Sequence, residues 1–187
     1  PPFRVYNAAK SGTAFYVNPL PANYLTALAQ WKPEIVMWNF SVNDVDGRRY
    51  NPQLQITAAK AMIDSFLSQA PSCRRILLCQ VWPGRSPLGG WGANHDLQIV
   101  EQAEAQYAMD GYAGGIVEFI PAYDLLGGQN YDTRFNLGLY PNMPSGVATN
   151  DIHPGGFGMM KMAEVVWPYL KAELLARPAV ISRPARS

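Results

Sequence analysis

The 187-residue sequence has few charged residues, and those it has nearly cancel. They make up 16% of the chain, where a soluble domain usually has about a quarter. Lys plus Arg is 15 and Asp plus Glu is 14, so the formal net charge is +1. Nucleic acids and anionic membranes both select strongly basic surfaces, which this balance excludes. No apolar run approaches the ~20 residues of a membrane span. We therefore expect no nucleic-acid partner and no membrane span.

Cysteine and histidine are also scarce, with two residues of each. Cys73 and Cys79 flank an apolar run that is typical of a buried strand, and six residues of strand rise about 20 Å. The Cα atoms of a disulfide lie roughly 4.4–6.8 Å apart, so we expect no bridge between them. His95 and His153 add too few ligands for a metal cluster.

Apolar residues are abundant, at 48%, and short apolar runs alternate with helical patterns. Strands are predicted at residues 3–6, 34–39, 76–81 and 115–120, and helices over 21–31, 51–70, 95–107 and 156–176. This alternation is typical of parallel strands joined by crossover helices. The predicted fold class is therefore α/β, a three-layer α/β/α sandwich. We expect one domain over residues 1–176, with a long loop at 125–150 and a tail over 177–187.

Two of these elements carry more detailed expectations. Asn51 caps the second helix, and Pro52 occupies its first position. The predicted buried stripe of that helix consists of Leu54, Ala58, Met62 and Phe66, with Ile63 and Leu67 beside it. The run at 35–38 is apolar on both faces, as a covered parallel strand would be.

Three polar segments fall where a predicted strand ends or the last helix begins. They are residues 7–12 (NAAKSG), 41–44 (SVND) and 150–154 (NDIHP). Ligands of open α/β sheets bind at the carboxyl ends of the strands. Taken singly, each segment is better explained by turn, cap or helix-entry residues than by a catalytic role. Their convergence on one rim would form a site.

The residue types in these segments suit acyl chemistry. His153 is a candidate general base, since neutral imidazole accepts protons near pH 7. A neighbouring carboxylate would fix its tautomer and stabilise the imidazolium. The side-chain amide of Asn43 and the backbone N–H of Gly12 are candidate donors to an oxyanion.

Taken in order, the three segments resemble the SGNH, or GDSL, hydrolase family over nearly the whole chain. Residues 7–12 are similar to its second block and residues 41–44 to its third block, Gly-x-Asn-Asp. Residues 151–154 are similar to its fifth block, Asp-x-x-His. The resemblance implies a flavodoxin-like parallel sheet and a serine esterase with His153 as base and Asp151 as its partner. It also implies an oxyanion hole at Gly12 and Asn43, and no metal or organic cofactor.

Two positions depart from the family pattern. Ser41 stands where the third block has glycine. The family's aspartate lies three residues before the histidine, where this chain has Asn150, and Asp151 lies only two before. Either Asp151 serves as the partner of His153, or Asn150 occupies the position and the histidine lacks a carboxylate. We favour Asp151, because an amide does not stabilise an imidazolium comparably.

The family's first block, Gly-Asp-Ser, has no counterpart, because the chain contains no Gly-Asp pair and no Gly-x-Ser-x-Gly elbow. In the family that block ends a central strand. Without such a strand, residues 5–6 would face residues 35–38 across a gap, and unpaired strand edges are costly. We expect an upstream segment of the same gene product to bring the strand and the serine, either cleaved but retained or lying before Pro1. Supply of the segment by another chain is the alternative. The tail at 179–182 is a less favoured substitute. The chain alone is expected to have little or no hydrolytic activity.

The substrate is less constrained. The Gly/Pro-rich loops contain four aromatic side chains: Trp82, Trp91, Tyr131 and Tyr140. They could stack on sugar rings, which favours acetyl esters on carbohydrate. Alternatively, they anchor those loops. The rival hypothesis is a non-catalytic SGNH-like module that binds glycan or a protein partner. The family resemblance favours a secreted, cell-surface or virion-associated setting.

Overall fold

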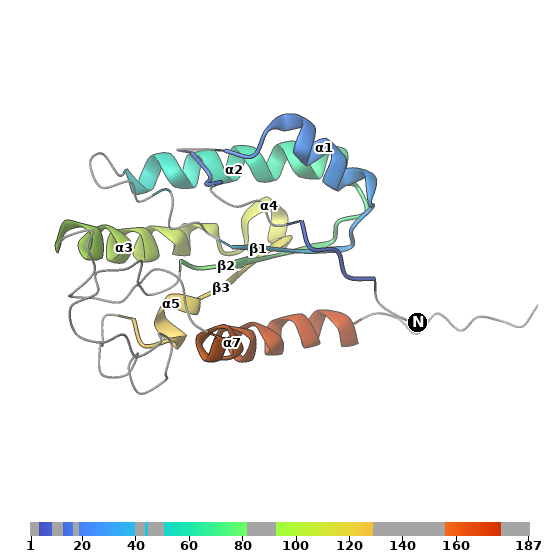
Figure 1. Cartoon of the computed structure of the whole chain (residues 1–187). Coiled ribbons are helices and arrows are strands. Elements are labelled where there is room, and N and C mark those ends of the chain that lie inside the picture. The colour runs from blue at the N-terminus through green and yellow to red at the C-terminus, as the bar shows by residue number, and fades with distance from the viewer. Residues whose placement is uncertain are drawn as a thin grey trace, which may run out of the picture.

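The computed structural model describes residues 4–8, 13–16, 19–39, 44, 51–81, 93–128 and 156–176, and the side chains of all of these except 93–97 and 156–158. Figure 1 shows the helices and strands of this part of the chain. In order they are α1 (Ala22–Gln30), β1 (Ile35–Asn39), α2 (Pro52–Gln69), β2 (Arg75–Cys79), α3 (Ala93–Gln106), the 3-10 turn η2 (Tyr107–Met109), α4 (Tyr112–Gly115), β3 (Val117–Ile120), α5 (Ala122–Leu125) and α7 (Gly156–Leu175).

The three strands form one parallel sheet in the order β1-β2-β3. Val36 is in register with Ile76, and Ile76 with Val117. Consecutive strands are joined through helices, as parallel pairing requires. The α/β prediction is confirmed. The short elements η2, α4 and α5 were not predicted.

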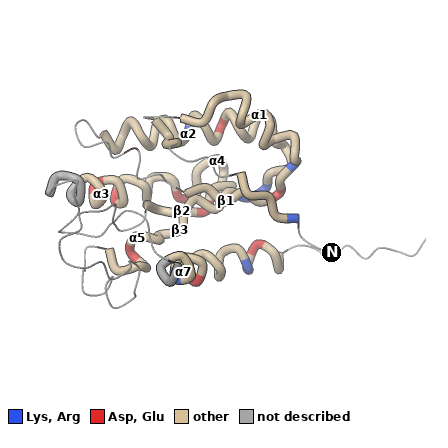
Figure 2. Tube along the Cα trace, viewed as in Figure 1, with Lys and Arg blue, Asp and Glu red and all other residues tan. Residues whose placement is uncertain are grey.

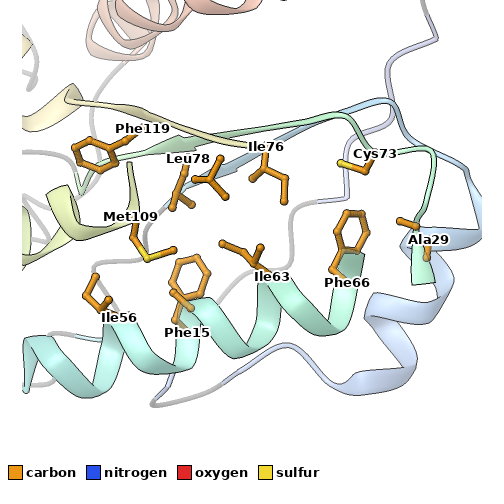
Figure 3. Close-up of a cluster of buried hydrophobic side chains, with 13 residues drawn as sticks. Phe15, Ala29, Ile56, Ile63, Phe66, Cys73, Ile76, Leu78, Met109 and Phe119 are labelled. Carbon is orange, nitrogen blue, oxygen red and sulfur yellow. The ribbon is translucent and has the colours of Figure 1, made fainter. Parts of the chain in front are cut away.

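The alternation of β2 separates two apolar layers. Ile76 and Leu78 belong to the cluster that contains the buried face of α2, which Figure 3 shows. Leu77 and Cys79 belong to a second cluster with Val166 of α7. Figure 1 shows α1 and α2 on one side of the sheet and α7 on the other. The period-two alternation of a strand therefore builds a three-layer sandwich.

Helix α2 begins where the sequence predicts. The Asn51 side chain accepts a hydrogen bond from the Leu54 backbone N–H at 3.1 Å, with Pro52 in the first turn. The predicted buried stripe is partly wrong, because Leu54 is exposed while Gln55 is buried. Hydrophobic spacing alone does not show that an inward-facing glutamine has a polar partner in the core. The residues of α2 that are buried are Gln55, Ile56, Ala59, Ile63 and Phe66.

The predicted strand at residues 3–6 is wrong over its described part. Residues 4–8 form no strand, and Val5 is 91% exposed. The expectation that β1 is covered on both faces is also wrong, because Met37 is 57% exposed. A strand needs a neighbour to satisfy its backbone groups. Within the described ranges, no strand pairs with the outer edge of β1.

Charged side chains gather where the strands begin. Glu173, near the end of α7, is buried, and its carboxylate binds Arg74 Nη1 and, at 2.7 Å, Arg75 Nε. Arg74 Nη2 also donates to the Glu173 backbone carbonyl at 2.9 Å. Figure 2 shows residues of both signs near this end of the sheet. These contacts fasten the end of α7 to the start of β2.

Helix α7 contains Pro168. Among the described helices, none combines the length and the apolar composition that crossing a membrane would require.

Candidate functional site

The fold has one edge at which strands end and helices begin. The parallel strands β1 and β2 end at Asn39 and Cys79, and α2 and α7 start at Pro52 and Gly156. Figure 1 places these strand ends and helix starts on the same side of the molecule. In α/β sheets this carboxyl edge is where ligands bind.

The predicted site residues all lie outside the described residues and stay predictions. They are Gly12, Asn43, Asp151 and His153, and the aromatic residues Trp82, Trp91, Tyr131 and Tyr140. The same is true of Ser41 and Asn150. The structure does describe the residues that flank three of these positions, at 13–16, at 44 and at 81.

Asp44 is the most informative of these flanking residues. Its side chain is fully buried. Oδ2 accepts hydrogen bonds from the Phe15 backbone N–H at 2.9 Å and from Gln55 Nε2 at 2.7 Å. Oδ1 accepts from the Tyr16 backbone N–H at 2.9 Å. A buried carboxylate needs such donors, because an unsatisfied one would be very costly.

These hydrogen bonds join the end of one polar segment to the chain just after another. Asp44 is the last residue of segment 41–44, and Phe15 lies three residues after the end of segment 7–12. The partners are 28 and 29 positions apart in the sequence. The structure therefore brings together the chain that follows Gly12 and the chain that follows Asn43. Turn or helix-cap chemistry was the alternative for Asn43 and Asp44 in the sequence, although a carboxylate after a buried strand in so weakly charged a chain was a usable signal.

The Phe15 side chain gives the same segment a second attachment. Its ring is buried and meets Trp38 of β1 edge-on, with centroids 6.4 Å apart. Trp38 in turn meets Phe66 of α2 at 5.3 Å. Figure 3 shows Phe15 among the core side chains of α2 and the sheet. Further upstream, the Tyr24 hydroxyl of α1 donates to the Ala8 carbonyl. The backbone is thus held at Ala8, within segment 7–12, and at Phe15, just after it.

Buried amides fix the carboxyl end of β2. Gln80 Nε2 donates to the Ala103 carbonyl of α3, and Gln80 Oε1 accepts from the Tyr123 backbone N–H of α5, both at 2.9 Å. The Val81 backbone N–H donates to Gln106 Oε1 at 2.8 Å. No sequence motif marks these glutamines as part of a site. They tie α3 and α5 to the strand end directly before Trp82.

The described residues offer neither a metal centre nor a cysteine nucleophile. None of them form a group of three or more His, Cys, Asp or Glu side chains suited to a metal ion. Cys73 and Cys79 are buried free thiols. Burial raises the pKa of Cys79 to about 12, and burial is also the main cause that raises the pKa of Cys73. Thiol reactivity depends on the thiolate form, so both side chains act as core residues.

The architecture is an α/β/α sandwich in which Asp44 is hydrogen-bonded to Phe15 and Tyr16. No family model and no curated protein sequence matches the chain, but solved structures do. A GDSL-like lipase from Bacteroides thetaiotaomicron VPI-5482 aligns with a TM-score of 0.56 and 19% identity, over 87% of this chain and 73% of the lipase.

Two further solved structures share the fold. One is described as a peptidoglycan O-acetylesterase in action, with a TM-score of 0.58 and 14% identity over 83% of this chain and 42% of that one. The other is the periplasmic domain of a lipopolysaccharide acetyltransferase from Salmonella ser. Paratyphi A, with a TM-score of 0.56 and 18% identity over 80% of this chain and 61% of that one. The chain spans less than two thirds of each. The SGNH/GDSL fold is thereby confirmed.

Proposed function

We propose that this chain is the acyl-transfer domain of an SGNH-type serine esterase, whose nucleophilic serine comes from an upstream segment of the same gene product. The observation that carries the proposal is the attachment of Phe15 and Tyr16 to Asp44. It joins the end of segment 41–44 to the chain just after segment 7–12, the two segments that resemble the family's oxyanion-hole blocks. The fold is shared with a GDSL-like lipase and a peptidoglycan O-acetylesterase.

In the proposed mechanism, the serine hydroxyl attacks the carbonyl carbon of an ester while His153 takes the hydroxyl proton. Gly12 and Asn43, with the serine's own N–H, hold the oxyanion. His153 then gives the proton to the leaving alkoxide, and the acyl group stays on the serine. Water attacks this acyl-enzyme while His153 takes a proton from it, and His153 returns that proton to the serine oxygen as the carboxylic acid leaves. Asp151 orients His153 throughout.

The outer edge of β1 supports the upstream segment. Within the described ranges, β1 pairs only with β2. A further parallel strand along this edge would satisfy the backbone of β1 and would end at the carboxyl edge, beside the segments that Asp44 joins.

The proposed substrate is an acetyl ester on a carbohydrate. Two structures with the same fold are described as an O-acetylesterase of peptidoglycan and an acetyltransferase of lipopolysaccharide. Trp82, Trp91, Tyr131 and Tyr140 would stack on the sugar rings. The same two descriptions, one of them of a periplasmic domain, favour a secreted, cell-surface or virion-associated setting.

The decisive test uses the two histidines of the chain. The protein is expressed with its natural upstream coding region, which must encode Gly-Asp-Ser, and hydrolysis of an aryl acetate is followed. His153→Ala should lower kcat about 10³-fold or more, while the matched variant His95→Ala should keep it. A longer protein without Gly-Asp-Ser, or equal activity in both variants, would overturn the esterase proposal.

The second candidate, a non-catalytic glycan-binding module, is favoured by the missing Gly-Asp pair. It predicts that acetylated oligosaccharide binds the longer protein and is recovered intact. The esterase instead predicts release of acetate, and Trp82→Ala should then raise KM for the oligosaccharide without raising it for the aryl acetate.

A further inference from the structure

We infer that Asp44 is the positioning residue of the proposed oxyanion hole. It would set the relative place of the two chain segments that carry Gly12 and Asn43. The inference rests on the proposed function, and goes beyond it by assigning a role to a residue that does not touch the substrate.

The hydrogen bonds of Asp44 are suited to holding a backbone in place. Its two oxygens accept from the N–H groups of successive residues, Phe15 and Tyr16, each at 2.9 Å. Two bonds from one planar carboxylate fix both the distance and the orientation of the peptide unit that they grip. The Phe15 ring, edge-on to Trp38, keeps the same residue from sliding along the core.

The charge of Asp44 matters as much as its position. An ionised carboxylate offers only acceptors, and hydrogen bonds to it are roughly twice as strong as neutral ones. All three contacts described above come from N–H donors. An asparagine at this position would turn an NH₂ group toward at least one of those donors. Asp44→Asn therefore preserves size while breaking part of the attachment.

Gln55 fixes the carboxylate itself. It lies in the first turn of α2 and is fully buried, and its Nε2 donates to Oδ2 of Asp44 at 2.7 Å. This contact explains why a glutamine occupies the buried face of α2. The start of α2 thus becomes the rigid reference to which both segments are attached.

Catalysis by an oxyanion hole is sensitive to such attachment. Its donors must lie about 2.7–3.1 Å from the developing oxyanion, and a displacement of about 1 Å can cost 10²-fold in rate. Asn43 directly precedes Asp44, and Gly12 lies three residues before Phe15. Movement at Asp44 would therefore shift one donor against the other.

The test compares three variants of the protein that carries its upstream segment. Asp44→Asn is expected to lower kcat for an aryl acetate about 100-fold, with KM changed less than about twofold. Asn43→Ala, which removes a proposed donor directly, gives the benchmark of about 10²–10³-fold. Glu173→Gln alters a buried carboxylate at the opposite edge of the sheet and should leave kcat unchanged. Circular dichroism and the fraction folded are measured for each variant.

Each outcome decides the inference. Full kcat in folded Asp44→Asn overturns it while the esterase stands. An equal loss of kcat in Glu173→Gln overturns it as well, because the effect would then follow general stability. If Asp44→Asn does not fold, Gln55→Leu replaces it and is expected to lower kcat about 10-fold; an unchanged kcat there overturns the inference. If the unaltered longer protein hydrolyses no ester, the proposed function fails and the inference fails with it.

Discussion

Asp44 and Glu173 are buried carboxylates at opposite edges of the same sheet, and they are held by different donors. Asp44 accepts from two backbone N–H groups and one side-chain amide. Glu173 binds the guanidinium groups of Arg74 and Arg75. The arginines are themselves about one third exposed, at 37% and 30% of their side chains.

Because of this difference, Asp44 fixes the position of the backbone, whereas Glu173 only attaches one element to another. Glu173 joins long flexible side chains, which tolerate small shifts of α7 against β2. Asp44 grips the backbone itself, so a shift of its carboxylate moves the main chain of residues 15 and 16. The edge that carries the proposed chemistry is therefore the one built with the shorter and stiffer attachment.

The largest expected effect is that of Asp44→Ala on stability. It would leave two buried donors and one partly buried donor without the carboxylate, and each unsatisfied buried donor costs about 1–3 kcal/mol. The free energy of unfolding in urea should fall by about 3 kcal/mol or more. Asn51→Ala, which removes an exposed cap a few residues away, should cost only about 1 kcal/mol. A similar loss of unfolding free energy in the two variants would contradict the idea that Asp44 holds the core more strongly than a surface cap does.

Glu173→Gln should have a smaller effect. The free energy of unfolding should fall by about 1–2 kcal/mol. The loss is small because Arg74 and Arg75 are partly exposed, so water can solvate them once the negative charge of Glu173 is removed. Added salt screens exposed charges. The difference in free energy of unfolding between Glu173→Gln and the wild type should therefore be smaller in about 0.5 M NaCl. The loss in Asp44→Ala should stay nearly constant in the same salt series. A loss in Glu173→Gln that exceeds that of Asp44→Ala would reverse the comparison.

A third carboxylate gives the smallest effect. Tyr107 is exposed, and its hydroxyl donates to Asp124, a hydrogen bond that is the main cause raising the pKa of Tyr107 to about 12 from 10.0. A raised folded-state pKa means that the contribution is complete below pH 10 and is lost as the pH rises toward 12. Tyr107→Phe should therefore be slightly less stable than the wild type at neutral pH and equally stable near pH 12. The absorbance difference between the wild type and Tyr107→Phe reports the Tyr107 phenolate, and it should rise with a midpoint near pH 12. A midpoint near pH 10 would contradict the hydrogen bond to Asp124.

Much of the fold could be predicted from the sequence because its signals are local. The Asn51-Pro52 start of α2 and the apolar run of β2 need only neighbouring residues to form. The strand at residues 3–6 was predicted wrongly, because its existence depends on a partner strand and not on its own composition.

The candidate site shows the same limit more sharply. The motifs at residues 7–12 and 41–44 could be found by their residue types, and nothing in their spacing shows how they are held. Gln55 lies next to the predicted stripe of α2 and faces inward because it bonds to Asp44. A hydrogen bond between residues far apart in the sequence leaves no periodic pattern, so the structure was needed to find it.

The two cysteines have a practical consequence. Cys73 lies in the cluster under α2 and Cys79 in the cluster under α7, so each layer of the sandwich contains one buried thiol. With a pKa of about 12, only a fraction on the order of one in ten thousand of the Cys79 side chains is thiolate at pH 8. Its alkylation must wait for the α7 layer to open, and that of Cys73 for the α2 layer. In single-cysteine variants, the alkylation rate of Cys73 would measure how often the α2 layer opens, and that of Cys79 how often the α7 layer opens.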